Sequence, residues 1–266
     1  MMRIEVFPNP DSASRRAAAR LHQLWQANPD LLLCAATGDS PTLTYRFFVN
    51  GFKSNTSGAP LPRLLKLDEW GGLALDDPAT CEQYLREHLI GPLHLPAHRY
   101  LGFHSAPARP EAECQRIASW LQKNGPIDVC VLGLGRNGHL AMNEPGADPH
   151  AGCHVAQLTE STLSHPMLGT ARSRPAYGLT VGLAEILAAR EIILLVFGQA
   201  KAVPLARLFA SEVARDFPAS WLWRHPNVIC LADADAVAAI SVERLESLGA
   251  EIRQPSNPIH YEPTQS

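Results

Sequence analysis

The chain has 266 residues, with 23 Lys and Arg against 26 Asp and Glu, and a formal net charge of -3. Such a chain has no long-range attraction for nucleic acid or anionic membranes, and we expect neither as a partner. Its longest apolar runs, such as 192–197, are too short to cross a bilayer, and the N-terminal residues lack the apolar segment and cleavage site of a signal peptide. The six cysteines form no C-x-x-C pair, so we expect a cytoplasmic protein without a bound metal.

Short apolar runs predict strands, and segments with helical spacing lie between them. In chain order, the expected strands are 3–7, 31–35, 64–67, 129–134, 155–158, 192–197 and 228–231; the expected helices are 12–26, 41–48, 81–89, 111–122 and 201–209. Continuous apolar runs suit strands buried on both faces, as in a parallel sheet. The alternation predicts a doubly wound, Rossmann-like α/β fold with helices on both faces of a mostly parallel sheet. We expect a single domain over residues 1–256 and a C-terminal tail over residues 257–266.

Four predicted strand ends carry polar or glycine-rich residues, and ligands of open α/β sheets bind beyond the carboxyl ends of the strands. The first such segment, 37–41, is a turn before a helix. Gly38 permits close backbone approach, Ser40 can cap the helix and Pro41 suits its first position. The amides of such a helix start favour a phosphate, although an ordinary capped turn uses the same residue types.

Two further strand ends carry charged residues. Asp68 and Glu69 follow a predicted buried strand, where one of them could act as a general base because burial raises the pKa of a carboxyl group. Both could equally cap the following turn. Lys201, at another strand end, can reach an anion that backbone amides already hold, although most lysines are simply solvated.

The most informative segment is residues 133–146, Gly-Leu-Gly-Arg-Asn-Gly-His-Leu-Ala-Met-Asn-Glu-Pro-Gly. It contains G-x-G-x-x-G, but Asn-Glu-Pro-Gly ends any helix after about one turn, whereas a dinucleotide-binding motif opens a long helix. The segment instead brings Asn137, His139 and Glu144 close together. A histidine beside a carboxylate suits proton transfer near neutral pH, and a core histidine bonded to the backbone is the alternative.

Together these segments resemble the sugar-phosphate isomerase and lactonase superfamily that includes glucosamine-6-phosphate deaminase and 6-phosphogluconolactonase. The resemblance covers residues 31–231. Residues 37–41 match its phosphate loop, 67–69 its acidic strand end, 133–139 its glycine–histidine loop, 158–162 the strand after that loop and 179–182 a later turn. Lactonases usually lack the Asn-Glu-Pro-Gly continuation, so residues 143–146 point to the deaminase branch.

The resemblance implies a role for each matching residue. Asp68 would take a proton from C2 of the sugar and deliver it to C1. His139 would assist ring opening, with Glu144 tuning its protonation and Asn137 orienting it. The residues implied to hold the substrate phosphate are Thr37, Gly38, Asp39, Ser40 and Lys201. The resulting imine would be hydrolysed at its carbon–nitrogen bond to a ketose phosphate and ammonia, with neither metal nor organic cofactor.

Position 137 bears on the substrate. Glucosamine-6-phosphate deaminases usually have Asp here, which would help to charge the histidine, whereas the amide of Asn137 can only orient it. The galactosamine-6-phosphate branch tolerates Asn, so the resemblance favours conversion of galactosamine-6-phosphate to tagatose-6-phosphate. Glucosamine-6-phosphate deamination to fructose-6-phosphate, lactone hydrolysis and non-catalytic sugar-phosphate sensing are the alternatives.

The chain departs from the family pattern at other positions. Asp39 replaces a small residue of the phosphate loop, and we expect its carboxylate to point away because it would repel phosphate. The arginine expected downstream falls near Leu168, where Arg172 or Arg174 could substitute after a loop shift. His154 stands where relatives under allosteric control carry an arginine, so a monomer or an unregulated homo-oligomer is expected.

Overall fold

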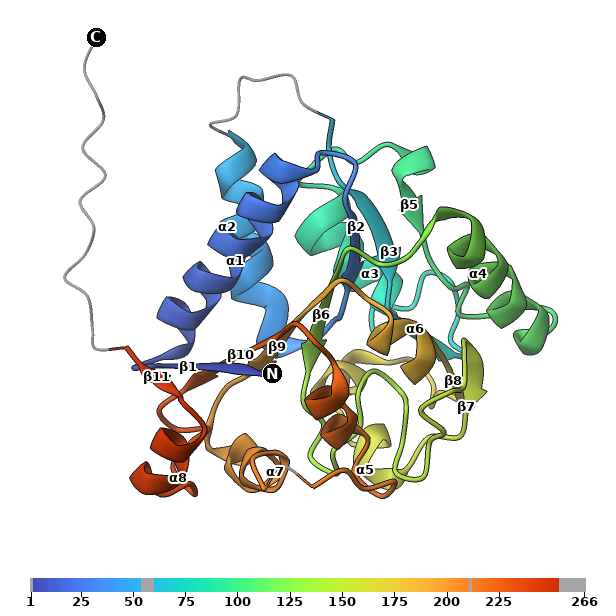
Figure 1. Cartoon of the computed structure of the whole chain (residues 1–266). Coiled ribbons are helices and arrows are strands. Elements are labelled where there is room, and N and C mark those ends of the chain that lie inside the picture. The colour runs from blue at the N-terminus through green and yellow to red at the C-terminus, as the bar shows by residue number, and fades with distance from the viewer. Residues whose placement is uncertain (1, 54–59, 211, 254–266) are drawn as a thin grey trace, which may run out of the picture.

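The computed structural model of the chain describes residues 2–53, 60–210 and 212–253 (Figure 1). Eight parallel strands form the main sheet, in the order β11-β1-β10-β9-β6-β2-β3-β5. These strands are β1 (Arg3–Phe7), β2 (Leu32–Ala35), β3 (Arg63–Lys66), β5 (Tyr100–Leu101), β6 (Val129–Gly133), β9 (Glu191–Val196), β10 (Val228–Asp233) and β11 (Glu251–Ile252). The expected α/β fold with a mostly parallel sheet is confirmed.

Helices cover both faces of this sheet. The α-helices are α1 (Pro10–Ala27), α2 (Asp39–Lys53), α3 (Cys81–Leu85), α4 (Pro110–Asn124), α5 (Glu160–Leu163), α6 (Leu183–Leu187), α7 (Ala202–Leu208) and α8 (Val242–Ser247). The shorter turns are a π-helix (Arg86–Ile90) and 3-10 helices at Ala97–Arg99, Pro166–Thr170, Gln199–Lys201 and Pro218–Arg224.

Neighbouring residues of the central strands enter different cores because side chains alternate between the faces of a sheet. Leu33 and Val131 pack in the core that α1 and α2 cover, whereas Cys34 and Cys130 pack in the core that α4 and α6 cover. In Figure 1, α1 and α2 lie on one side of the sheet and α4 and α6 on the other. Burial on both faces explains why these strands read as continuous apolar runs.

A second sheet of three antiparallel strands was not expected from the sequence. Its order is β4-β8-β7, and its strands are β4 (Asp68–Gly71), β7 (His154–Ala156) and β8 (Tyr177–Thr180). The predicted strand 155–158 is therefore shorter and belongs to this sheet. Val155 is only partly buried, as expected for a strand covered less completely than those of the main sheet.

The segment 158–162, expected as a strand by resemblance, is also different. Its strand ends at Ala156, and α5 begins at Glu160 because the Thr159 side chain caps the helix by accepting from the Thr162 amide. The predicted tail 257–266 lies outside the described residues, and the single-domain organisation remains a prediction.

The order of the main sheet locates a ligand site. From β2 the chain continues to β3 and β5 on one side, and from β6 it continues to β9 and β10 on the other. Strands β2 and β6 are paired neighbours. The connections that follow them diverge at their carboxyl ends, which creates the crevice where doubly wound proteins bind ligands.

Candidate active site

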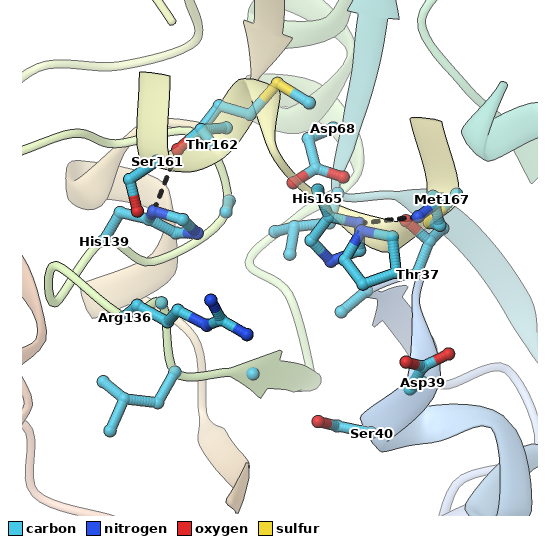
Figure 2. Close-up of a pocket in the computed structure, with 18 of the residues that line it drawn as sticks. Thr37, Asp39, Ser40, Asp68, Arg136, His139, Ser161, Thr162, His165 and Met167 are labelled. Carbon is cyan, nitrogen blue, oxygen red and sulfur yellow. Dashed lines mark hydrogen bonds between the residues drawn. The ribbon is translucent and has the colours of Figure 1, made fainter. Parts of the chain in front are cut away.

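A pocket of about 300 Å³ opens at the carboxyl ends of the adjacent strands β9, β6, β2 and β3 (Figure 2). All four predicted strand ends contribute to it. The predicted site residues that line it are Thr37, Asp39, Ser40, Asp68, His139 and Lys201. Gly38, Asn137 and Glu144 are not part of the lining, but each lies next to a histidine that is.

The predicted phosphate loop begins α2. Gly38 has φ +99°, a left-handed conformation that favours glycine, and a Cβ there would lie 3.3 Å from Cε1 of His165. The helix starts at Asp39, two residues earlier than expected, so Pro41 is not its first residue. The first amides of a helix have no intrahelical acceptor, and those of α2 begin at the pocket.

Asp39 also lines the pocket, and Figure 2 shows its carboxylate on the same side as Ser40. Its charge acts on His165 and Lys201, raising the pKa of each against the stronger effect of burial. Its charge therefore acts on the pocket, while the direction of the carboxylate relative to a bound phosphate stays a prediction. As the first residue of α2, Asp39 is favourably placed for the helix dipole, which explains why a carboxylate is stable there.

The structure separates the roles of the two neighbouring acids. The Glu69 carboxylate is fully buried, and it accepts from Nζ of Lys66 at 2.6 Å and from the amide of Cys81 at 2.8 Å. Glu82 also contacts Lys66, at 2.9 Å, so a buried lysine lies between two carboxylates. These bonds hold the Glu69 carboxylate in the interior, so Asp68 is the acid of this pair that lines the pocket.

The Asp68 carboxyl is 8% exposed, and burial, with the nearby charge of Glu69, raises its pKa to about 7. Cys81, which the sequence did not indicate, donates its thiol to Oδ1 of Asp68 at 3.8 Å and accepts from the Thr37 hydroxyl at 3.3 Å. Burial, Glu69 and Asp68 raise the pKa of Cys81, so it remains a thiol that can donate. A carboxyl group with a pKa near neutrality suits a general base.

The second acid–base group is His139, held by Glu144 and Thr162. The Thr162 hydroxyl donates to Oε1 of Glu144 at 2.5 Å and lies 3.2 Å from Nδ1 of His139 (Figure 2). A hydroxyl has one hydrogen, so we assign Nδ1 as the donor to Thr162. Nε2 is then the ring atom available to a substrate, and Oε2 of Glu144, 3.7 Å from Nδ1, stabilises a protonated ring.

Asn137 acts through Glu144 and the backbone. Its amide donates to Oε2 of Glu144 at 2.8 Å, and its carbonyl oxygen accepts from the His139 amide at 3.2 Å. Burial alone would raise the pKa of Glu144, but the neighbouring His139 and hydrogen bonds from Thr162 and Asn137 outweigh it and hold the pKa at about 2. Glu144 is therefore ionised beside the histidine at neutral pH.

Glycine at position 135 is required by the histidine. A Cβ on Gly135 would lie 2.5 Å from ring atoms of His139, closer than any real contact. The ring therefore packs directly on the backbone of the glycine-rich loop. This close packing fixes the orientation of the imidazole. It also explains why the G-x-G-x-x-G pattern has glycine at position 135 without invoking a bound dinucleotide.

Lys201 and two residues without an assigned role in the sequence complete the pocket. Nζ of Lys201 donates to the carbonyl oxygen of Leu134 at 2.6 Å, and burial with the nearby charge of Arg136 lowers its pKa. His165 accepts from the Met167 amide at Nδ1, and burial lowers its pKa, so it presents a neutral ring. Arg136 lies within the glycine-rich segment that the sequence singles out, but no role was predicted for it there, and His165 lies outside every predicted motif.

Arg172 and Arg174, considered from the sequence as phosphate ligands, lie outside the pocket lining. They pair with surface carboxylates, Arg172 with Asp76 at 2.9 Å and Arg174 with Glu160 at 2.6 Å. Across residues 2–53, 60–210 and 212–253, no group of three or more His, Cys, Asp or Glu side chains could hold a metal ion, and no helix is long and apolar enough to span a membrane.

The fold and the pocket define a doubly wound α/β protein with an acid–base site at its topological switch point. The chain matches the family described as glucosamine-6-phosphate isomerases/6-phosphogluconolactonase over residues 9–230, and it belongs to that family.

Similar proteins agree with this assignment. The chain is 40% identical to the protein named "Putative deaminase AgaI" of Escherichia coli (strain K12), over 86% of this chain and 90% of that one. It is 34% identical to a glucosamine-6-phosphate deaminase of Geobacillus sp. (strain WCH70), over 91% and 98%. Among solved structures, a monomeric glucosamine-6-phosphate deaminase superposes with a TM-score of 0.85 at 30% identity, covering 90% of this chain and all of that chain.

Proposed function

We propose that this chain deaminates an amino-sugar phosphate, giving a ketose phosphate and ammonia. The observation that carries the proposal is the placement of two acid–base groups in one pocket beside a helix start. Asp68 is a buried carboxyl group with a pKa of about 7, and His139 is backed by an ionised Glu144. The names of the similar deaminases support the same reaction class.

The chemistry follows from the position of each group. Protonated at Nε2, His139 donates this proton to the ring oxygen of the sugar. The bond between C1 and the ring oxygen breaks, and the C1 hydroxyl releases its proton to water, which leaves an aldehyde at C1. Asp68 then removes the C2 proton of the open-chain amino aldose and delivers it to C1, a transfer that one positioned carboxylate can perform. In the same conversion the aldehyde oxygen takes up a proton from water and the amino group releases one, so the product is an imine at C2 beside a hydroxyl at C1. Water adds to that carbon and ammonia leaves, so the carbon–nitrogen bond is hydrolysed.

Phosphate binding supplies energy remote from the reacting carbons. The helix start at residues 38–40 and the ammonium group of Lys201 are the groups proposed to hold it. Anchoring at this end places C1 and C2 at the other end of the pocket, where Asp68 and His139 lie.

For the substrate, we propose galactosamine-6-phosphate, with tagatose-6-phosphate as the ketose product. Asn137 supports this choice because the galactosamine branch, by resemblance, accepts an amide where glucosamine deaminases usually carry Asp. In this chain the amide donates to Glu144, a bond that an ionised Asp could not make.

Glucosamine-6-phosphate, with fructose-6-phosphate as product, is the second candidate. It is favoured by the names of several relatives that share about a third of their residues with this chain, and by the name of the structure with a TM-score of 0.85. The two candidates differ only in the configuration of the 4-hydroxyl group.

The test is ammonia release from both substrates, side by side and without added metal. Faster release from galactosamine-6-phosphate supports the proposal, and faster release from glucosamine-6-phosphate overturns the assignment of the epimer. Release from neither, with hydrolysis of 6-phosphogluconolactone, would replace deamination by lactone hydrolysis. In that case Asp68→Asn and Glu144→Gln should both retain activity, because a lactonase needs no isomerising base.

A further inference from the structure

Two cationic side chains, Lys201 and Arg136, line the pocket. Lys201 is fixed by its bond to the carbonyl oxygen of Leu134. Arg136 lines the same pocket, and in Figure 2 its guanidinium extends from the glycine-rich loop across the pocket toward the side that carries Asp39 and Ser40. A planar guanidinium with five donors suits an oxyanion that can accept two hydrogen bonds at once.

Arg136 also differs from the other arginines considered for this site. Arg172 and Arg174 each have a carboxylate partner within 3 Å and lie on the surface. Within the part of the chain that the structure describes, no carboxylate forms an ion pair with Arg136. An arginine that reaches into a pocket and forms no ion pair there is suited to an anionic ligand.

The charge balance of the pocket gives a second reason for an arginine here. Asp39 places a negative charge beside the helix start, where it opposes the positive charge of Lys201. Without Arg136 these two charges would offset each other, and an incoming phosphate would meet little net attraction. With Arg136 the same end of the pocket carries a net positive charge.

We propose that Arg136 is a second phosphate-binding side chain, which acts with Lys201 and offsets the charge of Asp39. The inference rests on the proposed amino-sugar phosphate substrate. It assigns a role to a residue of the glycine-rich loop that otherwise takes no part in the acid–base chemistry. The loop then has two functions, since His139 serves the reacting carbons and Arg136 serves the phosphate.

The experiment compares Arg136→Gln with Arg174→Gln, which removes an arginine from the surface and serves as the matched control. Arg136→Gln is expected to raise KM for the amino-sugar phosphate by about 10- to 100-fold, as for loss of a charge-assisted hydrogen bond, with a much smaller change in kcat. Inhibition by inorganic phosphate should weaken in parallel. Arg136→Lys should retain part of the affinity, because lysine keeps the positive charge but lacks the planar guanidinium that donates two hydrogen bonds at once.

The charge balance is tested with Asp39→Asn. This change should lower KM in the wild-type background and recover part of the affinity lost in Arg136→Gln. Unchanged KM and unchanged phosphate inhibition in Arg136→Gln, or an equal effect of Arg174→Gln, would overturn the inference.

Calorimetric binding of inorganic phosphate separates the two proposals. If neither amino-sugar phosphate is turned over but Arg136→Gln still weakens phosphate binding, the proposed function fails and the role of Arg136 stands. If both substrates release ammonia with no effect of Arg136→Gln, the role of Arg136 fails alone.

Discussion

Replacing Asp68 by Asn tests the general base through its effect on stability as well as on activity. Folding raises the pKa of this carboxyl group from its ordinary 3.8 to about 7. Between these values the folded protein holds a proton that the unfolded chain has lost, so the free energy of unfolding falls as the pH rises. The full rise in the pKa corresponds to a free-energy cost of roughly 4 kcal/mol for keeping the buried carboxylate ionised in the folded protein.

Asp68→Asn removes this cost without changing the shape of the side chain. Relative to wild type, the variant should gain roughly 2–3 kcal/mol of unfolding free energy when the pH is raised from 5 to 8, since each pH unit below the folded pKa contributes about 1.4 kcal/mol. Urea denaturation at the two pH values measures this gain. Comparing the two values cancels packing effects that do not depend on pH.

The same variant should lose exchange of the C2 proton while still binding the sugar phosphate. Asp216→Asn is the control, because that exposed carboxylate forms only a surface ion pair with Arg207. An equal stability change at pH 5 and pH 8 would mean that Asp68 is already ionised in the folded protein at pH 5. Exchange at the wild-type rate would mean that another group is the base.

Three other changes test the groups around the base. Lys66→Met should lower the free energy of unfolding by about 3–5 kcal/mol, because it leaves the buried carboxylate of Glu69 without its cation. Denaturation measures this loss, and a loss smaller than that expected for a surface ion pair would contradict the role of Lys66 in stabilising Glu69. Glu144→Gln should lower kcat about 100-fold or more, since a neutral amide does not stabilise protonated His139; steady-state kinetics that match wild type would exclude this role. Asn137→Asp should move the alkaline limb of the pH–rate profile to higher pH by adding negative charge near the imidazole, and an unmoved limb would show that position 137 does not tune the histidine.

The strand–helix alternation and the contents of the strand ends follow from the sequence, because burial on both faces of a parallel sheet leaves a local apolar pattern. That pattern placed Asp68, His139 and Lys201 at carboxyl ends of strands. The order of the sheet in the structure brings β9, β6, β2 and β3 side by side. The start of α2 differs from the predicted one by two residues, because capping and tertiary packing set the ends of a helix.

Other features depend on long-range contacts that leave no local pattern. The antiparallel sheet pairs β4 with β8, which lies about 110 residues further along the chain, and β8 with β7, about 25 residues before it. Its strands have only three or four residues each, too few to stand out as strands in the sequence. The choice between Asp68 and Glu69 was made by contacts between β4 and the start of α3, where the amides of Cys81 and Glu82 donate to the Glu69 carboxylate.

The arginine that faces the pocket was likewise decided by tertiary structure. Arg172 and Arg174 lie nearer in sequence to the expected position, but surface carboxylates hold them outside the pocket. Arg136 reaches the pocket because its loop follows β6, next to the start of α2 at the switch point. Sequence alone thus determined which residue types stand at the strand ends. Only the fold decided which side chains share the cavity, since that depends on the order of the strands and on contacts between distant segments.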